Sequence, residues 1–352
     1  MKTTNRTVKI AASRIGRNAP DAESDPRSPS FSFEAARKYT QGNVDRTIAS
    51  FVKAGEAGAD AVCSIEDIKC MDPFISLEQK SRFLDLAETI PGPTSEMLAV
   101  IARRYNMHIA ANYYERDGGD AYNTTVLLGR DGGIIGKYRK IHMPAHERWM
   151  AAPGADVPVF ETDIGAIGLS ICYDIVFPEH CRSLALNGAD IILHSTGGWG
   201  FTYGNLGMEL LRVRAAENAV YIANAYSFNL ARPHSNSCIV NNAGDALAIN
   251  DSQTEDGIAI AGFAPDYDMM KERQFWAFFS GVPSARARTT LERMPETYGA
   301  LTESRPPIVR GRYAGYRYAR NYDAIKSISE KWSEYRQDGY DGREPKLPYE
   351  WE

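Results

Sequence analysis

One stretch constrains the fold of this chain more than any other, residues 166–198, because a strand, a turn, a helix and a second strand follow one another there. Ala166–Ile171 is an apolar run of strand length, and Pro178 is typical of the first turn of a helix. Ala189–Leu193 is a second apolar run of strand length. This order predicts an α/β unit, with Cys172 at the point where the first strand gives way to a turn.

Cys172 is a candidate nucleophile because a strand end holds its side chain in place while pointing it into open space. If the N-terminus of the following helix faces the sulfur, the pKa of the thiol should fall and thiolate should become available. The alternative is a small buried hydrophobic residue, which is the commoner role of a lone cysteine after an apolar run. For the other four cysteines burial is the better interpretation: Cys63, Cys70, Cys181 and Cys238.

The rest of the chain up to about residue 263 repeats the α/β pattern, with hairpins between the units. Apolar runs and turn residues predict the following elements: strands at 8–12, 59–65, 107–113, 220–225 and 258–263, helices at 43–57, 94–105 and 205–218, and hairpins over 123–138 and 237–249. Strands that alternate with helices and are interrupted by hairpins predict an α/β fold with mixed sheets.

Composition narrows the class of function. A length of 352 residues suits one large domain or two modest ones, and a net charge of −5 gives no reason to expect nucleic acid or an anionic membrane as a partner. Five cysteines without regular spacing indicate reduced thiols, and hence a cytoplasmic protein. CxxC, HExxH, GxxxxGK[ST] and GxGxxG motifs are absent from the sequence, so we expect no metal site and no cofactor.

The composition shifts near Asp266 toward arginine, tyrosine, proline and tryptophan. We therefore expect a main domain over 1–265 and a C-terminal extension over 266–352. Residues 305–320 interleave basic and aromatic side chains, as RNA-binding tails can. In an acidic chain without a nucleic-acid-binding motif, an arm that packs on another subunit is the better interpretation, which predicts a homodimer or a larger homo-oligomer.

Two further residues at strand ends would complete a site for acyl transfer. Glu66 follows the apolar run 59–65, and Lys140 follows the second strand of the 123–138 hairpin. Ligand sites in α/β sheets collect at strand ends. A thiolate at Cys172 could attack a carbonyl carbon, a carboxylate could take and return protons, and an ammonium with a backbone N–H could hold the oxyanion. Taken singly, a strand-end acid or lysine is more often simply solvated.

The chain resembles the nitrilase, or carbon–nitrogen hydrolase, superfamily. The matching segments are ADAVCSIED around Glu66, GKYRKIHMP around Lys140 and ICYDIVFPEHCRSLALNGADII around Cys172, with support from AYNTTVLLGRDGGIIGKYRK and ELLRVRAAENAVYIANA. The resemblance implies a four-layer α-β-β-α sandwich that dimerises or assembles further. It implies that Glu66 is the general base, Lys140 the oxyanion stabiliser and Cys172 the nucleophile.

The same resemblance extends to the substrate. Glu147 matches a second family glutamate that positions the substrate or the lysine, and the Tyr173 N–H would be the second oxyanion donor. Cys-Tyr-Asp resembles the amidase and carbamoyl-hydrolase branches, whereas true nitrilases more often have Cys-Trp-Glu; this implies a small carboxamide or N-carbamoyl substrate cleaved through a thioester. Tyr113, Trp149 and Trp199 are candidates for the pocket wall, although ordinary packing is the commoner role of each.

Three alternatives to that reaction remain open at this stage. A nitrile or cyanide hydrolase would use the same three residues. An acyltransferase would pass the thioester to an amine in place of water. A catalytically inactive scaffold of the same fold would need none of the three.

Overall fold

Two six-stranded sheets form the body of the protein. The computed structural model describes residues 7–76, 79–144, 147–197, 207–228, 236–267 and 284–303. The first sheet has the order β12-β1-β2-β3-β4-β5, with β12 (Gly257–Phe263), β1 (Val8–Arg14), β2 (Ala61–Cys63), β3 (His108–Asp117), β4 (Asp120–Leu128) and β5 (Ile134–Arg139). The second has the order β11-β10-β9-β8-β7-β6, with β11 (Ala246–Asn250), β10 (Ser237–Val240), β9 (Tyr221–Tyr226), β8 (Ile191–Thr196), β7 (Gly165–Ile171) and β6 (Val159–Thr162).

Both sheets are mixed, as the sequence predicts. In the first sheet β1, β2 and β3 run parallel, and in the second β7, β8 and β9 do. The remaining neighbours pair antiparallel. The parallel strands are almost fully buried and apolar, which is typical of strands covered on both faces.

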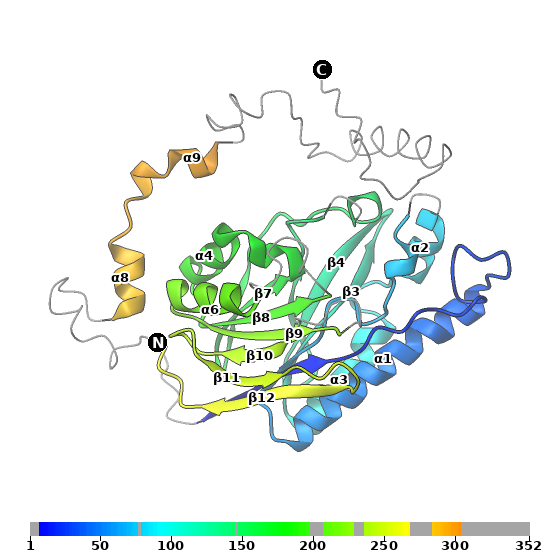
Figure 1. Ribbon diagram of the computed structural model, residues 1–352, viewed down its shortest axis with the longest axis horizontal. Helices are drawn as coiled ribbons and strands as arrows, with labels where there is room; N and C mark the ends of the chain where they lie inside the picture. The colour runs from blue at the N-terminus through cyan, green and yellow to red at the C-terminus, as the bar shows by residue number, and fades with distance from the viewer. Residues whose placement is uncertain are drawn as a thin grey trace. The chain divides into compact units, whose positions relative to one another are not determined.

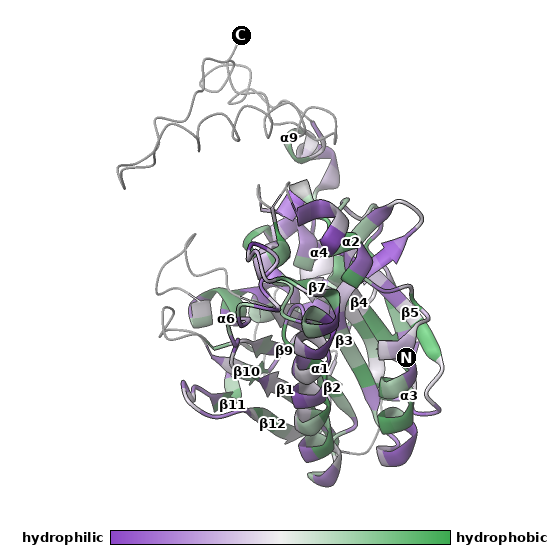
Figure 2. Ribbon diagram, turned by 90° about the vertical axis from the view of Figure 1, so that its right-hand side faces the viewer, coloured by the Kyte–Doolittle hydropathy of each residue, from purple (hydrophilic) through white to green (hydrophobic). Residues whose placement is uncertain are grey.

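Helices cover the outer face of each sheet and give four layers, α-β-β-α (Figure 1). On the first sheet lie α1 (Phe33–Glu56) and α3 (Pro93–Tyr105), and on the second lie α4 (Pro178–Leu186) and α6 (Gly207–Asn218). The inner faces of the sheets meet where β1 packs on β9 and β10, and where β4 packs on β7. In Figure 2 these central strands are mostly green, while the outer helices carry purple, hydrophilic segments. The expected four-layer sandwich is confirmed.

Two boundaries differ from the sequence-based expectation by more than a few residues or add an element. Helix α1 begins at Phe33, well before the predicted start at Asn43, because the Ser32 hydroxyl caps it by accepting the Ala35 N–H. Asn43 lies within the helix, where its amide donates to the Tyr39 carbonyl. Strand β3 runs past the predicted end at residue 113 and continues through a tight turn into β4, which adds a hairpin that the sequence analysis did not predict.

The smaller elements flank the sheets or follow them. They are η1 (Asp72–Phe74), α2 (Lys80–Leu86), η3 (Glu147–Trp149), η4 (Cys172–Val176), α8 (Ala285–Leu291), η5 (Pro295–Thr297) and α9 (Gly299–Thr302). The chain divides into two compact units, residues 1–289 and 290–352. Among the described residues, none of the helices combines the length and the apolar character that crossing a membrane requires.

Candidate active site

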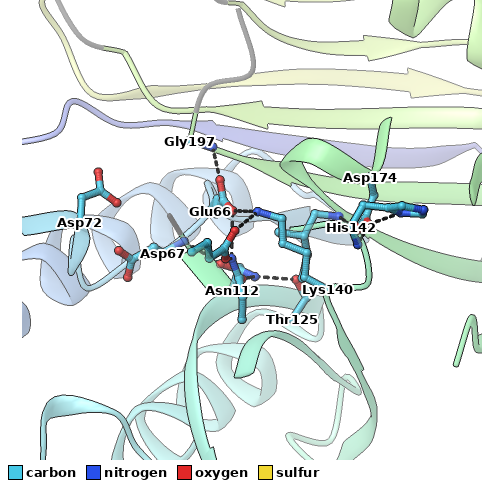
Figure 3. Close-up of polar contacts among 12 residues, drawn as sticks. Glu66, Asp67, Asp72, Asn112, Thr125, Lys140, His142, Asp174 and Gly197 are labelled. Carbon is cyan, nitrogen blue, oxygen red and sulfur yellow. Dashed lines mark hydrogen bonds and ion pairs between the residues drawn. The ribbon is translucent and has the colours of Figure 1, made fainter. Parts of the chain in front are cut away.

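Glu66 and Lys140 meet in the interior although 74 positions separate them in the sequence (Figure 3). Glu66 follows β2. The segment around it stays paired with β3, because the Ser64 N–H donates to the Ala110 carbonyl and the Ile68 N–H donates to the Asn112 carbonyl. Lys140 follows β5, and its own N–H donates to the Asn123 carbonyl in β4. The Lys140 ammonium lies 2.7 Å from Glu66 Oε1, and both side chains are buried.

Glu147 completes a buried cluster of two carboxylates and one ammonium. Its Oε2 lies 2.7 Å from Lys140 Nζ, and its Oε1 accepts a hydrogen bond of 3.2 Å from the Tyr114 hydroxyl. Two of the three N–H groups of Lys140 thus donate to carboxylates. The third has no hydrogen-bond partner among the residues that the structure describes. That third N–H is the kind of donor an oxyanion needs.

The pKa values of the cluster follow from this pairing. Burial alone would raise the pKa of Glu66, but the ion pair and hydrogen bond with Lys140 outweigh it and lower the pKa to about 2. Burial opposes the charge of Lys140 too, but Glu147 and Glu66 hold the pKa of the ammonium well above its usual value. Glu66 is therefore an ionised base and Lys140 a cation at neutral pH.

Cys172 stands at the predicted junction, directly after β7 and at the first position of η4. Its φ of 44° lies in the left-handed region, which a residue with a side chain rarely adopts. The thiol lies near the Glu66 carboxylate and the Lys140 ammonium, whose charges act on its pKa. The Tyr173 N–H follows in the first turn of η4, where N–H groups have no acceptor within the helix.

The expectation of a lowered thiol pKa is wrong. Burial raises the pKa of Cys172, and the adjacent negative charge of Glu66 raises it further, to about 12, although Lys140 opposes this. Cys172 is therefore a protonated thiol near an ionised carboxylate, and it could act as a nucleophile only by losing its proton.

Asp174 ties the Cys172 turn to the Lys140 segment. Its Oδ2 accepts hydrogen bonds from the Tyr138 hydroxyl and the Ile171 N–H, and its Oδ1 accepts them from the N–H and the ring Nδ1 of His142. Asp174, His142 and His180 each bring one potential metal-ligating atom within 4.8 Å of the others. Because four donors already occupy the oxygens of Asp174, this group is better explained as a structural brace than as a metal site.

Of the predicted pocket residues, Tyr113 does not join the cluster. It points to the opposite face of β3, where it is fully buried and its hydroxyl has no hydrogen-bond partner among the described residues. Tyr114, one residue on, faces the cluster and contacts Glu147, because successive side chains of a strand alternate between faces. Trp199 and the side chain of Trp149 lie outside the described residues.

Arg17 and Gly197 are contacts of Glu66 that sequence reasoning missed. Arg17 donates to the Glu66 carbonyl at 2.7 Å and to the Ser227 hydroxyl at 3.0 Å, and it pairs with Asp72. The Gly197 N–H donates to Glu66 Oε2 at 2.9 Å. A Cβ on Gly197 would lie 2.5 Å from Arg17 Nη2 and 3.0 Å from Glu66 Oε2, so an added methyl group would have to displace these side chains.

Comparison with known proteins assigns this chain to a family. The sequence profile described as carbon-nitrogen hydrolase matches residues 40–267, a span that contains Glu66, Lys140, Glu147 and Cys172. The chain belongs to the carbon–nitrogen hydrolase family. The resemblance to the nitrilase superfamily is thereby confirmed, and the protein is a carbon–nitrogen hydrolase.

Individual relatives of this carbon–nitrogen hydrolase agree with the family. A citrullinase of Francisella tularensis is 28% identical over 281 residues, which cover 74% of this chain and 92% of the relative. The omega-amidase NIT2 of Bos taurus is 33% identical over 65% of this chain and 84% of its own length. Among solved structures, an amidase from Nesterenkonia sp. superposes with a TM-score of 0.56 at 21% identity, over 79% of this chain and 98% of its own. This last likeness shows the shared fold.

Proposed function

We propose that this carbon–nitrogen hydrolase is a thiol amidohydrolase that cleaves a small carboxamide or an N-carbamoyl compound through a thioester on Cys172. The observation that carries the proposal is that the Cys172 thiol lies near Glu66, a carboxylate kept ionised by an ion pair with Lys140. The relatives include a citrullinase and an omega-amidase, and these names support a substrate of this kind for the present chain.

In the first half-reaction the sulfur of Cys172 attacks the carbonyl carbon while its proton passes to Glu66. The π-electron pair moves onto the carbonyl oxygen, which the third N–H of Lys140 and the backbone N–H of Tyr173 stabilise. The tetrahedral intermediate collapses, the C–N bond breaks, and Glu66 returns the proton to the leaving nitrogen. Ammonia or an amine departs, and the acyl group remains on sulfur.

In the second half-reaction Glu66 takes a proton from water, whose oxygen attacks the thioester carbon. Collapse of this intermediate breaks the C–S bond, and the proton goes back to sulfur. The products are the carboxylic or carbamic acid and the free thiol. Glu147 holds the Lys140 ammonium in place through both steps.

The test is a panel of carboxamides, N-carbamoyl amino acids and the matching nitriles, assayed for ammonia with the unaltered protein and with Cys172→Ala. We expect ammonia from at least one amide or carbamoyl compound, none from the variant, and an intact-mass increase equal to the acyl group in the unaltered protein alone. Activity retained by Cys172→Ala would refute the mechanism. A preference for a nitrile over its amide would favour a nitrile hydrolase.

Two further alternatives have their own readouts in the same panel. Hydroxamate formed faster with hydroxylamine than acid is formed with water would favour acyl transfer. Failure of every compound to give ammonia or an adduct would favour an inactive scaffold.

The five cysteines are all free thiols, which is in keeping with a cytoplasmic protein. We retain the proposal that residues 266–352 are an arm for homo-oligomer assembly, testable by comparing the mass in solution with that of a variant truncated after residue 303.

A further inference from the structure

A chain of two asparagine side chains leads from the backbone beside Glu66 to the two carboxylates of the site. The Asp67 N–H donates to Asn112 Oδ1 at 2.6 Å, and Asn112 Nδ2 donates to Asn123 Oδ1 at 2.8 Å. Asn123 Nδ2 then donates to Glu66 Oε1 at 2.9 Å and to Glu147 Oε1 at 2.5 Å. Both asparagines are buried, on the facing strands β3 and β4.

The direction of this chain is fixed at its start. A backbone N–H can only donate, so the side-chain oxygen of Asn112 must face Asp67. Its amino group then faces Asn123 and the Thr125 hydroxyl, 3.1 Å away (Figure 3). The oxygen of Asn123 must accept from that amino group, which leaves the Asn123 amino group for the carboxylates. The orientation of both amides, which bond lengths alone do not reveal, therefore follows from one backbone N–H.

The chain also distinguishes the two oxygens of Glu66. Oε1 accepts from Lys140 at 2.7 Å and from Asn123 at 2.9 Å, so two donors fill its two lone-pair positions. Oε2 accepts the Gly197 N–H at 2.9 Å, and no other backbone or nitrogen donor among the described residues reaches it. One lone-pair position of Oε2 therefore stays open for a proton.

We propose that the Asn112–Asn123 chain is a positioning device that keeps Glu66 Oε1 occupied and reserves Oε2 for the proton of Cys172. This inference rests on the proposed function. As the S–C bond forms, the S–H bond breaks and its proton moves to Oε2, from which it later passes to the leaving nitrogen. Asn123 acts through Glu66 and Glu147, and Asn112 acts through Asn123 without touching either carboxylate.

The first test is Asn123→Asp, which keeps the size of the side chain but turns a donor into an acceptor. At pH 8 we expect kcat to fall about 10- to 100-fold, the value of a hydrogen bond to a charged group, while KM changes little. Burial beside the Glu66 and Glu147 carboxylates should raise the pKa of the new carboxyl well above the ordinary aspartate value, so that it takes up a proton and regains an O–H donor as the pH falls to 6. The ratio of variant to unaltered kcat should therefore rise about tenfold. A ratio independent of pH would overturn the proposal.

The second test, Asn112→Asp, reaches the site from one residue further away. One oxygen of the new carboxylate can still accept the Asp67 N–H, but the other faces Asn123 Oδ1. We expect the Asn123 amide to turn over and present its oxygen to the two carboxylates, with a loss of kcat about as large as in Asn123→Asp. Activity within twofold of the unaltered protein would contradict the proposed direction of the chain.

Asn224→Asp is the matched control, because Asn224 is a buried strand asparagine of the other sheet whose amide donates to the Asn236 carbonyl. It should lose stability yet show a flat activity ratio between pH 6 and pH 8; a rising ratio would count against the inference. If Asn123→Asp fails to fold, Asn123→Ser serves, since a hydroxyl donates to only one carboxylate and kcat should still fall. An unaltered protein without an acyl adduct would instead refute the proposed function before any variant is compared.

Discussion

Replacing Lys140 by methionine should expose the cost of two buried carboxylates without their cation. The side chains are similar in length, but the ammonium that lies 2.7 Å from both Glu66 and Glu147 is lost. Removing one partner of a buried ion pair destabilises a protein by about 3–5 kcal/mol. Because one N–H to the oxyanion is lost as well, kcat should fall by a factor of about 100–1,000.

The loss of stability should depend on pH in a definite direction. In the unaltered protein the pKa of Glu66 lies at about 2, below its ordinary 4.5, so its charge stabilises the fold above pH 4.5 and that contribution is lost as the pH falls toward 2. Without Lys140, burial raises this pKa above 4.5, and the variant then loses stability as the pH rises. The difference in free energy of unfolding should therefore be larger at pH 8 than at pH 5.

Urea unfolding at the two pH values measures this difference, with activity read in parallel. The double variant Lys140→Met, Glu66→Gln is the control, because it removes a charge that has lost its partner and should regain part of the stability at pH 8. Equal destabilisation at pH 5 and pH 8, or no recovery of stability in the double variant, would show that Lys140 does not stabilise the protein through its ion pairs.

Three further substitutions test single contacts. Gly197→Ala should lower kcat at least about tenfold while the fold survives, since the added methyl displaces the Glu66 carboxylate and costs a charge-assisted hydrogen bond; circular dichroism and kinetics separate the two effects. Tyr114→Phe should lower kcat several-fold by removing a donor to the second glutamate, whereas Tyr113→Phe should leave kcat unchanged, and the reverse result would contradict the strand register. Burial, with a nearby aspartate, raises the pKa of Asp67 to about 7, so Asp67→Asn should gain stability relative to the unaltered protein as the pH rises from 4 to 8; a constant difference in thermal unfolding would refute this.

Much of the fold could be predicted because strands and helices are local patterns. The apolar runs before Glu66 and Cys172 and the basic run that ends at Lys140 mark strand ends, and these three residues do meet in space. The predicted start of α1 was wrong because Asn43 and Ser32 are both good capping residues, and only the surrounding structure selects one of them.

What could not be predicted depends on contacts between distant segments. The pKa of Cys172 rises because Glu66 lies beside it, and no local pattern carries that information. Recognising that Tyr114 faces the cluster, and Tyr113 does not, required knowing which face of β3 each side chain occupies, and a shift of one residue reverses this. Asn123 stood within a matching segment, but its role follows only from the two carboxylates that its amide reaches.

The buried, protonated state of Cys172 has a consequence for how this enzyme survives oxidative stress. Because burial and the charge of Glu66 raise the pKa of Cys172 to about 12, very little of this thiol is ionised at pH 7, and peroxides react with the ionised form. In the proposed mechanism the sulfur becomes a strong nucleophile only as it loses its proton during attack on the substrate carbon. An idle enzyme should therefore tolerate hydrogen peroxide far better than a cysteine enzyme that stores its nucleophile as a thiolate.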